Sequence, residues 1–357
     1  MKKMPKIMSL LLGATLTGTL LLSGCGAKDK GSVSEQNTQN KSNQVETKKI
    51  TLWGVIDPQI SAQQVIAEKK GYFKEEGIDV ENKFVQSGPE IGPMIAGGSA
   101  PLSFETNYTV TSSVASNIPV KLVAPVANIG GTQALVIRKD LVINSAKDLE
   151  GKKIGMAPGS GVYIAIKKMC DELGVDISKI KFVYLQPADQ IAALDKKDID
   201  AMACWEPWVT KASAVGGKIL FSGKKSYLPE KKGDVDWLNF ISTFQVSEDF
   251  LKKNPNTVKA VLRALDKATV FINEHRDESI DILSKEFKID KNDLKKMMDE
   301  NIYTMQVDNT IYNGVNEMSS FMLEQKNIRK KPEFKDLTDF SLLKEVSPDK
   351  VKLDSIK

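Results

Sequence analysis

Short blocks of alternating or continuous hydrophobic residues recur along the chain, and longer segments with helical spacing separate them. Residues 50–55 and 79–85 predict strands, and a helix begins between them at residues 61–67. Residues 101–104 and 120–126 predict two more strands. Strands that alternate with helices of this length are typical of α/β units around a mainly parallel sheet. The N-terminal part of the globular body therefore predicts an α/β lobe.

A second run with the same alternation occupies the middle of the chain, where residues 153–157, 181–185 and 199–205 predict strands. Two similar segments flank this run, and each is a strand that leads into a charged turn. We expect these segments, residues 134–140 and 243–249, to be paired crossover strands between two lobes. The second lobe is then an insertion in the first.

From Asn254 onward the pattern is helical. One face of the first helix there consists of Val258, Val261, Leu262, Leu265, Ala268, Thr269 and Ile272. Further helices are expected near residues 277–287, 290–301 and 310–325. We expect these helices to complete the first lobe.

The N-terminal segment has the pattern of an export signal. Lysines among the first six residues precede an apolar run over residues 7–22, which ends in the sequence LSGC at Cys25. The run is short for a spanning helix, and small residues precede the cysteine, as processing requires. The ending resembles a bacterial lipobox, so we expect lipidation of Cys25. The alternative is an ordinary signal peptide with an incidental cysteine.

Residues 26–48 are polar, hold no aromatic side chain, and contain only Ala27, Val33 and Val45 as apolar residues. Such a segment cannot bury enough apolar surface to offset the loss of chain entropy on folding. We expect a disordered linker that tethers the protein, through its lipid, to the extracytoplasmic face of the cell membrane.

Composition narrows the classes of function. The remaining body exceeds what one core usually serves, and it has an ordinary share of hydrophobic (41%) and charged (27%) residues. The formal net charge of +4 includes the signal lysines, so the mature chain is near neutral and we expect no nucleic-acid partner. Cys170 and Cys204 lie in apolar patterns and predict buried thiols. With His275 as the only histidine, we expect no metal, no cofactor and no catalytic site.

Several strings resemble those of a known family: AEKKGYFKEEGI at residues 67–78, LEGKKIG at 149–155, GSG at 159–161 and DAMACWEP at 200–207. The chain resembles the solute-binding lipoproteins of bacterial ABC importers, and within them the nitrate/sulfonate/taurine (NMT1/THI5-like) periplasmic-binding-protein group. The resemblance implies two lobes that close on a small-molecule ligand and then dock on a permease, which is coupled to an ATPase. It implies no catalysis.

Together these patterns predict a type II periplasmic-binding-protein fold, that is, two three-layer α/β lobes joined by two crossover strands. The expected parts are a lipoprotein signal peptide at 1–24, a lipidated linker at 25–48, the first lobe at 49–138 and 243–357, and the second lobe at 139–242.

Predicted helix N-termini follow strand ends near residues 57–60, 87–91 and 158–162. Backbone N–H groups at such termini can hold an anionic or polar ligand, and loops after strand ends line the crevice of open α/β sheets. The alternative is that Gly, Pro and Ser only form turns there, and for Asn107 that it is a helix cap. Trp205 is expected against the body of the ligand. The expected ligand-binding residues are Trp53, Gln59, Ser87, Pro89, Glu90, Ile91, Asn107, Gly130, Ser160, Gly161, Val162, Trp205 and Glu206.

We expect capture of a small anionic or polar solute of the aliphatic sulfonate, taurine or nitrate class and its delivery to an ABC permease. Glu206 departs from this expectation, because a carboxylate repels an anion unless it turns away or meets a cation. If Glu206 faces the cleft, the ligand carries a cationic or N–H end. The alternatives are a binder of a heteroaromatic vitamin precursor (thiamine pyrimidine or riboflavin class), an exported enzyme, and a structural lipoprotein.

Overall fold

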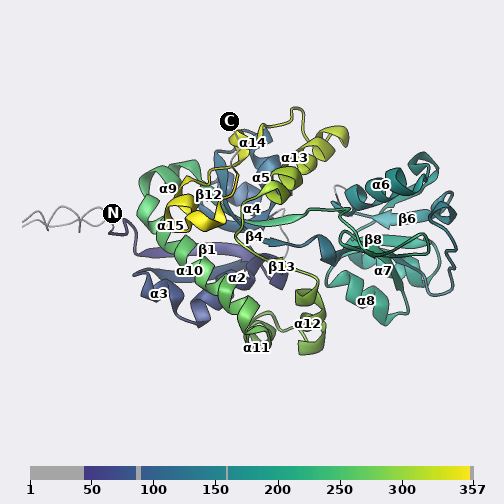
Figure 1. The fold of residues 1–357 in the computed structure, drawn as a ribbon, viewed down its shortest axis with the longest axis horizontal. Helices are drawn as coiled ribbons and strands as arrows, with labels where there is room; N and C mark the ends of the chain where they lie inside the picture. The colour runs from purple at the N-terminus through teal and green to yellow at the C-terminus, as the bar shows by residue number, and fades with distance from the viewer. Residues whose placement is uncertain (1–43, 86–89, 158–159, 354–357) are drawn as a thin grey trace, which may run out of the picture. The chain divides into compact units, whose positions relative to one another are not determined.

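The computed structural model describes residues 44–85, 90–157 and 160–353. The predicted signal peptide, Cys25 and nearly all of the linker lie outside these residues, as do Ser87 and Pro89. The described residues form one compact unit. It contains a six-stranded sheet and a seven-stranded sheet, each with its own helices (Figure 1). We call these the first and the second lobe.

The six-stranded sheet of the first lobe has the order β13-β4-β12-β3-β1-β2. Its strands are β1 (Lys49–Val55), β2 (Asp79–Val85), β3 (Leu102–Thr106), β4 (Val120–Asn128), β12 (Ile241–Ser247) and β13 (Ile302–Tyr303). Strand β1 pairs in parallel with β2 and β3, whereas β12 pairs antiparallel with β3 and β4. The sheet is therefore mixed and not mainly parallel, because β12 brings the chain back from the second lobe in the opposite direction.

Helices cover both faces of this sheet, which gives three layers (Figure 1). One group consists of α2 (Pro58–Lys69), α3 (Tyr72–Glu75), α10 (Pro255–Glu274), α11 (Arg276–Phe287) and α12 (Lys291–Asp299). The other group includes α4 (Ile91–Ala96), α5 (Asn107–Ala115), α13 (Asn309–Glu324) and α14 (Phe334–Leu337). Helices α9 (Glu248–Lys253) and α15 (Ser341–Val346) lie near the end of the first lobe that is far from the second lobe. The expected apolar face of α10 is confirmed, since each residue predicted on it is buried.

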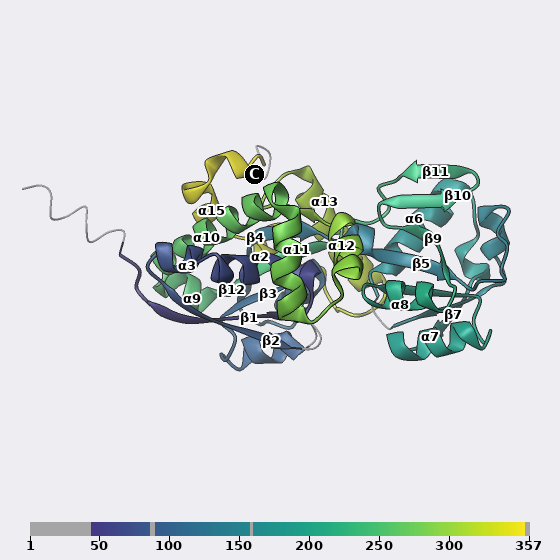
Figure 2. The ribbon, with the colours of Figure 1, turned by 90° about the horizontal axis from the view of Figure 1, so that it is seen from below.

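The seven-stranded sheet of the second lobe has the order β11-β10-β9-β5-β8-β6-β7, part of which Figure 2 shows side by side. Its strands are β5 (Gln133–Ile137), β6 (Lys153–Met156), β7 (Lys181–Tyr184), β8 (Ala201–Trp205), β9 (Lys218–Ser222), β10 (Lys225–Leu228) and β11 (Lys231–Asp234). Only β6 pairs in parallel, with β7 and with β8. The other pairs are antiparallel, so this sheet is mixed as well.

Alternation along the central strands of the second lobe builds a core on each face. Leu135 and Ala203 face the core of α6 (Val162–Leu173), whereas Val136 and Met202 face the core of α7 (Pro187–Asp195) and α8 (Trp208–Ala214). The expected buried thiols are confirmed: Cys170 lies in the first of these cores and Cys204 in the second, both free. Burial raises the pKa of each thiol to about 12, so neither is a reactive thiolate near neutral pH.

The chain crosses between the sheets at residues 129–132 and 235–240, which we call the two passages. The expected crossover strands lie instead within the sheets: most of residues 134–140 form β5 of the second lobe, and residues 243–247 belong to β12 of the first. The two segments are similar because each belongs to a strand that begins just after the chain has crossed between the sheets. We use the sheets, rather than the boundaries predicted at residues 139 and 242, to define the lobes.

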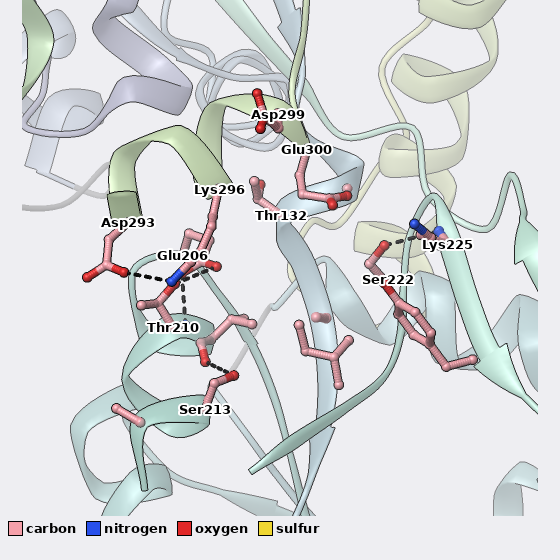
Figure 3. Close-up of a pocket in the computed structure, with 16 residues that line it drawn as sticks. Thr132, Glu206, Thr210, Ser213, Ser222, Lys225, Asp293, Lys296, Asp299 and Glu300 are labelled. Carbon is pink, nitrogen blue, oxygen red and sulfur yellow. Dashed lines mark hydrogen bonds and ion pairs between the residues drawn. The ribbon is translucent and has the colours of Figure 1, made fainter. Parts of the chain in front are cut away.

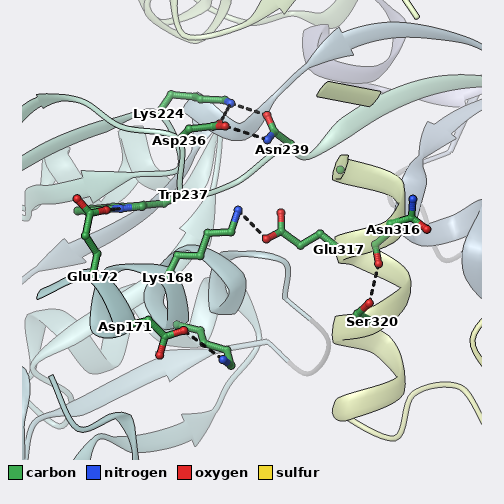
Figure 4. Close-up of polar contacts among 12 residues, drawn as sticks. Lys168, Asp171, Glu172, Lys224, Asp236, Trp237, Asn239, Asn316, Glu317 and Ser320 are labelled. Atoms are coloured by element: carbon green, nitrogen blue, oxygen red, sulfur yellow. Dashed lines mark hydrogen bonds and ion pairs between the residues drawn. The ribbon is translucent and has the colours of Figure 1, made fainter. Parts of the chain in front are cut away.

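Helix α13 belongs to the cores of both lobes. Ile311 and Val315 lie in the core of the first lobe, whereas Met318 and Met322 lie in the core of the second. Figure 4 shows α13 beside α6, where Lys168 and Glu317 form an ion pair with an N–O distance of 2.6 Å. The helices predicted near 277–287, 290–301 and 310–325 are confirmed as α11, α12 and α13. The C-terminal part nevertheless completes both lobes and not the first alone.

Glycines allow the first passage to come close to the second passage and to the end of α12. A Cβ on Gly130 would meet the carbonyl oxygen of Leu238, and a Cβ on Gly131 would meet that of Glu300. The Ile129 N–H donates to the Phe240 carbonyl at 2.8 Å, so the passages are also hydrogen bonded to each other. Side chains at the two glycines would separate these segments.

We expect Gly130→Ala and Gly131→Ala to lower the free energy of unfolding by roughly 1–3 kcal/mol each, as overpacking against backbone does. Gly92→Ala in α4 is the control, because its Cβ would come no closer than 3.8 Å to Ser113 Oγ. Urea denaturation of the three variants measures the difference. Equal stabilities for Gly130→Ala, Gly131→Ala and Gly92→Ala would show that the passages are not closely packed.

Candidate functional site

The N-terminus of α2 follows β1 and faces the first passage. Asp57 caps the helix, since its Oδ1 accepts from the N–H groups of Gln59 and Ile60 at 2.8 and 2.9 Å. Gln59 is buried, and its Nε2 donates to the Glu206 carbonyl oxygen at 3.1 Å. Its Oε1 accepts from the Thr132 hydroxyl. Gln59 therefore links the first lobe to the passage and to the end of β8.

Glu206 is only 9% exposed and holds the start of α8. Its two carboxylate oxygens accept from the backbone N–H and the hydroxyl of Thr210, both at 3.0 Å. Burial raises the pKa of Glu206, and the hydrogen bonds from Thr210 oppose that rise. Asp293 and Lys296 act on it with opposite signs. The carboxylate thus occupies a helix N-terminus, which favours negative charge.

Glu206 also lines a cavity of about 580 Å³ between the two lobes (Figure 3). The walls come from α8, β9, β10 and the first passage on one side and from α12 on the other. Both signs of charge line the cavity, through Glu206, Asp293, Asp299, Glu300, Lys225 and Lys296. Of the ligand-binding residues expected from the sequence, it contains Glu206 alone.

The N-terminus of α6 has hydrogen-bond donors without an acceptor among the described residues. Ser160 is 5% exposed, and its hydroxyl has no hydrogen-bond partner among the described residues. Within the same residues, the N–H groups of Gly161 and Val162 have no acceptor either. Gly161 has φ −61°, and a Cβ there would lie 3.7 Å from Met318 Cε and from Phe240 Cζ. The terminus therefore lies where the second lobe meets α13 and the second passage.

Four other expected residues serve the packing of the lobes. Both ends of the Asn107 amide are engaged, since Nδ2 donates to the Gly314 carbonyl at 3.0 Å and Oδ1 accepts from the Ile241 N–H at 3.3 Å. This agrees with a structural role in the first lobe. Ile91 and Val162 are fully buried in the two cores. Gly130 is the residue at which the first passage comes close to Leu238 of the second passage.

The remaining expected residues are more accessible. Trp53 is half-buried on β1, with its Nε1 unpartnered among the described residues and Lys83 Nζ 5.7 Å from the ring centroid. Trp205 is half-buried at the end of β8, in the second lobe. Glu90 is exposed just before α4. Of the expected residues, the structure thus brings Gln59 and Glu206 into contact, and it places the start of α6 beside the second passage.

The sequence analysis missed a pair of carboxylates. Glu105 on β3 is 3% exposed; its Oε2 accepts from the Thr106 N–H and the Thr109 hydroxyl at 2.9 and 2.8 Å. The pKa of Glu105 is raised to about 7, mainly by burial and in part by the charge of Asp57, while the hydrogen bonds from Thr109 and Thr106 limit the rise. Burial also raises the pKa of Asp57 to about 6. An acid inside the apolar string LSFET was the available signal, but the predicted strand ended at Phe104.

No group of three or more His, Cys, Asp or Glu in the described parts of the chain is placed to hold a metal ion. In the same parts, no helix is both long and apolar enough to cross a bilayer.

Two α/β lobes joined by two chain passages are the architecture of the type II periplasmic-binding-protein fold. The family model described as NMT1/THI5 like matches residues 60–279. The chain belongs to this family.

The relatives of the chain include binding proteins for organic sulfonates. The chain is 26% identical over 335 residues to a putative aliphatic sulfonates-binding protein of Bacillus subtilis, with 91% of this chain and 92% of the relative covered. It is 24% identical over 270 residues to the taurine-binding periplasmic protein of Escherichia coli, with 72% and 81% covered.

Solved structures share the fold. The periplasmic aliphatic sulphonate binding protein SsuA of Escherichia coli superposes with a TM-score of 0.69 at 17% identity, covering 82% of this chain and 92% of its own. The periplasmic nitrate-binding protein NrtA from Synechocystis PCC 6803 gives 0.65 at 17% identity, with 86% and 90% covered. The desulfurization enzyme DSZB gives 0.62 at 14% identity, with 84% and 99% covered, so the fold also carries catalysis.

The buried carboxylates predict a pH-dependent stability. The pKa of Glu105 is about 7 in the folded protein and about 4.5 when unfolded, so the folded state holds a proton that the unfolded state has lost between these values. Stability therefore falls as pH rises through this window, by at most roughly 3 kcal/mol for Glu105. Asp57 acts in the same direction between 3.8 and about 6.

We expect Glu105→Gln to reduce the loss of stability with rising pH, because the amide does not titrate. Thermal unfolding between pH 4.5 and 8 of the native protein and of Glu105→Gln measures the difference. Parallel pH profiles for the two proteins would contradict the raised pKa of Glu105.

Proposed function

We propose that the protein is a lipid-anchored, extracytoplasmic solute-binding protein that captures a small anionic or polar solute between its lobes and delivers it to the permease of an ABC importer. The solute belongs to the aliphatic sulfonate, taurine or nitrate class. The observation that carries the proposal is the start of α6, where the hydroxyl of Ser160 and the N–H groups of Gly161 and Val162 have no acceptor among the described residues.

Backbone N–H groups at a helix start attract an anion without a charged side chain, because the helix dipole and the unsatisfied donors act together. Neutral donors also release the anion readily when lobes separate. The names of the relatives, which bind sulfonates and taurine, support the solute class.

Membrane attachment is the second part of the proposal. The LSGC sequence that ends at Cys25 resembles a lipobox, and residues 26–48 have the composition of a flexible tether. A tethered binding protein stays close to the permease it serves, so loss by diffusion is avoided.

We expect Ser160→Ala and Trp205→Ala to weaken solute binding, the latter by roughly 1–3 kcal/mol, as the loss of one large aromatic contact does. The assay is isothermal titration calorimetry on the mature chain with taurine, alkanesulfonates and nitrate, after a thermal-shift screen that also includes thiamine pyrimidines and flavins. Trp208→Ala is the control, because Trp208 lies in the same core but beside Lys211 on α8. If all three variants bind like the native protein, the site lies elsewhere.

Gly161→Val tests close backbone approach at the same helix. Since Gly161 has an ordinary negative φ, a side chain there is compatible with the fold, while it would crowd Phe240 and Met318 and the donors beside them. We expect lower affinity at a nearly unchanged melting temperature, measured by calorimetry and thermal unfolding. Unchanged affinity would exclude a ligand at this helix start.

We expect Cys25→Ala to release the protein from the membrane fraction with an unaltered fold, because the lipid is attached at the far end of the linker. Fractionation and immunoblotting of washed membranes measure the release, and circular dichroism of the released protein measures the fold. Retention of Cys25→Ala in the membranes would contradict the anchor.

A further inference from the structure

The first lobe contains buried polar groups that have no hydrogen-bond partner among the described residues. Ser103 and Glu105 point to the same face of β3, and Gln245 on β12 lies opposite Ser103. The Ser103 hydroxyl, Glu105 Oε1 and Gln245 Oε1 have no partner among the described residues, and these side chains are 1%, 3% and 0% exposed. A buried acceptor without a donor destabilises the fold. Two acceptor oxygens, Glu105 Oε1 and Gln245 Oε1, and the Ser103 hydroxyl thus lie unpaired on neighbouring strands, where a hydrogen-bond donor from outside the chain would satisfy the acceptors.

Asp57 brings a second carboxylate to this region. It follows β1, which pairs in parallel with β3, so Asp57 and Glu105 both lie at the carboxyl edge of the sheet, where binding crevices form. Its Oδ1 caps α2, whereas its Oδ2 has no hydrogen bond within the described residues. Unlike Glu105, Asp57 is partly exposed.

No cation in the described parts of the chain is among the groups that shift the pKa of either acid. Their pKa values are raised mainly by burial, and the charge that acts on Glu105 is the like charge of Asp57. By contrast, Glu206 has Lys296 nearby and both of its oxygens are hydrogen bonded. Asp57 and Glu105 therefore form a negative site that repels an anion and favours a cation.

We propose that Asp57 and Glu105 bind a positively charged nitrogen of the solute, so that the solute is a zwitterion with an ammonium or protonated amino-heterocyclic group at one end. Its anionic or polar end then binds the start of α6. The inference rests on the proposed function and narrows its solute class. An ammonium group supplies three N–H donors, and its hydrogen bonds to carboxylates are the strong, charge-assisted kind.

The inference separates solutes that the proposed function groups together. Nitrate and simple alkanesulfonates have no positive charge to offset two carboxylates, whereas an aminoalkanesulfonate has one. The rival explanation is that buried waters satisfy the acceptors and that no solute reaches them.

The experiment compares taurine with isethionate, which share the ethanesulfonate body and differ in an ammonium against a hydroxyl group. Nitrate is a further probe that carries no positively charged nitrogen group able to donate hydrogen bonds. Calorimetry at pH 8, where both acids are more fully ionised, is run on the native mature chain and on Glu105→Gln and Asp57→Asn. Asp290→Asn is the matched control, because Asp290 caps α12 through the same pair of N–H groups that Asp57 uses at α2.

We expect the native protein to bind taurine at least ten times more tightly than isethionate or nitrate. Glu105→Gln and Asp57→Asn should each weaken that binding tenfold or more, and Asp290→Asn should not. Glu105→Gln is isosteric, so its melting temperature reports whether the fold is kept, and Asp57→Asn tests the same site independently.

Equal binding of taurine and isethionate, or binding of nitrate that Glu105→Gln leaves unchanged, would overturn the inference while the proposed function stands. Failure of every probe to bind the native protein would overturn the solute class of the proposed function, and the inference with it.

Discussion

The close contact between the two chain passages is the constraint on which the other features depend. Gly130 and Gly131 bring the first passage against the carbonyl groups of Leu238 and Glu300, and a hydrogen bond joins Ile129 to Phe240. Because the passages contact each other, the two connections between the sheets run side by side. The end of β8, the start of α2 and the start of α6 are all anchored near this contact, which brings residues distant in sequence, such as Gln59 and Glu206, into contact.

Three helices begin near the boundary between the lobes, and they differ in whether a carboxylate caps the first turn. Asp57 occupies the start of α2 and Glu206 that of α8, so the protein's own carboxylates use the donors of these helices. The start of α6 has no such cap among the described residues. A helix terminus without an internal anion is the one that has donors to offer to a solute.

The sequence predicted the parts of the structure that depend on local pattern. The β1–α2–β2 unit, the apolar face of α10 and the C-terminal helices follow from periodicity, and the family from short strings such as DAMACWEP. The hairpin strands β10 and β11 were missed, because their lysine-rich sequences lack an apolar alternation. Glu105 and the placement of α13 were also missed. Both depend on which distant elements cover a residue, and that information is absent from local spacing.

The membership of α13 in two cores has a consequence for the order in which the chain can fold. The strands and helices of the second lobe occupy residues 133–234, yet its core is completed by Met318, Met322 and Ile328, almost a hundred residues further on. These long-range contacts form late and slow folding. A chain that emerges from its N-terminus therefore leaves the apolar face of α6 uncovered until nearly the whole protein is available. Export in an unfolded state is compatible with such a sequence, since the core of the second lobe cannot be completed early.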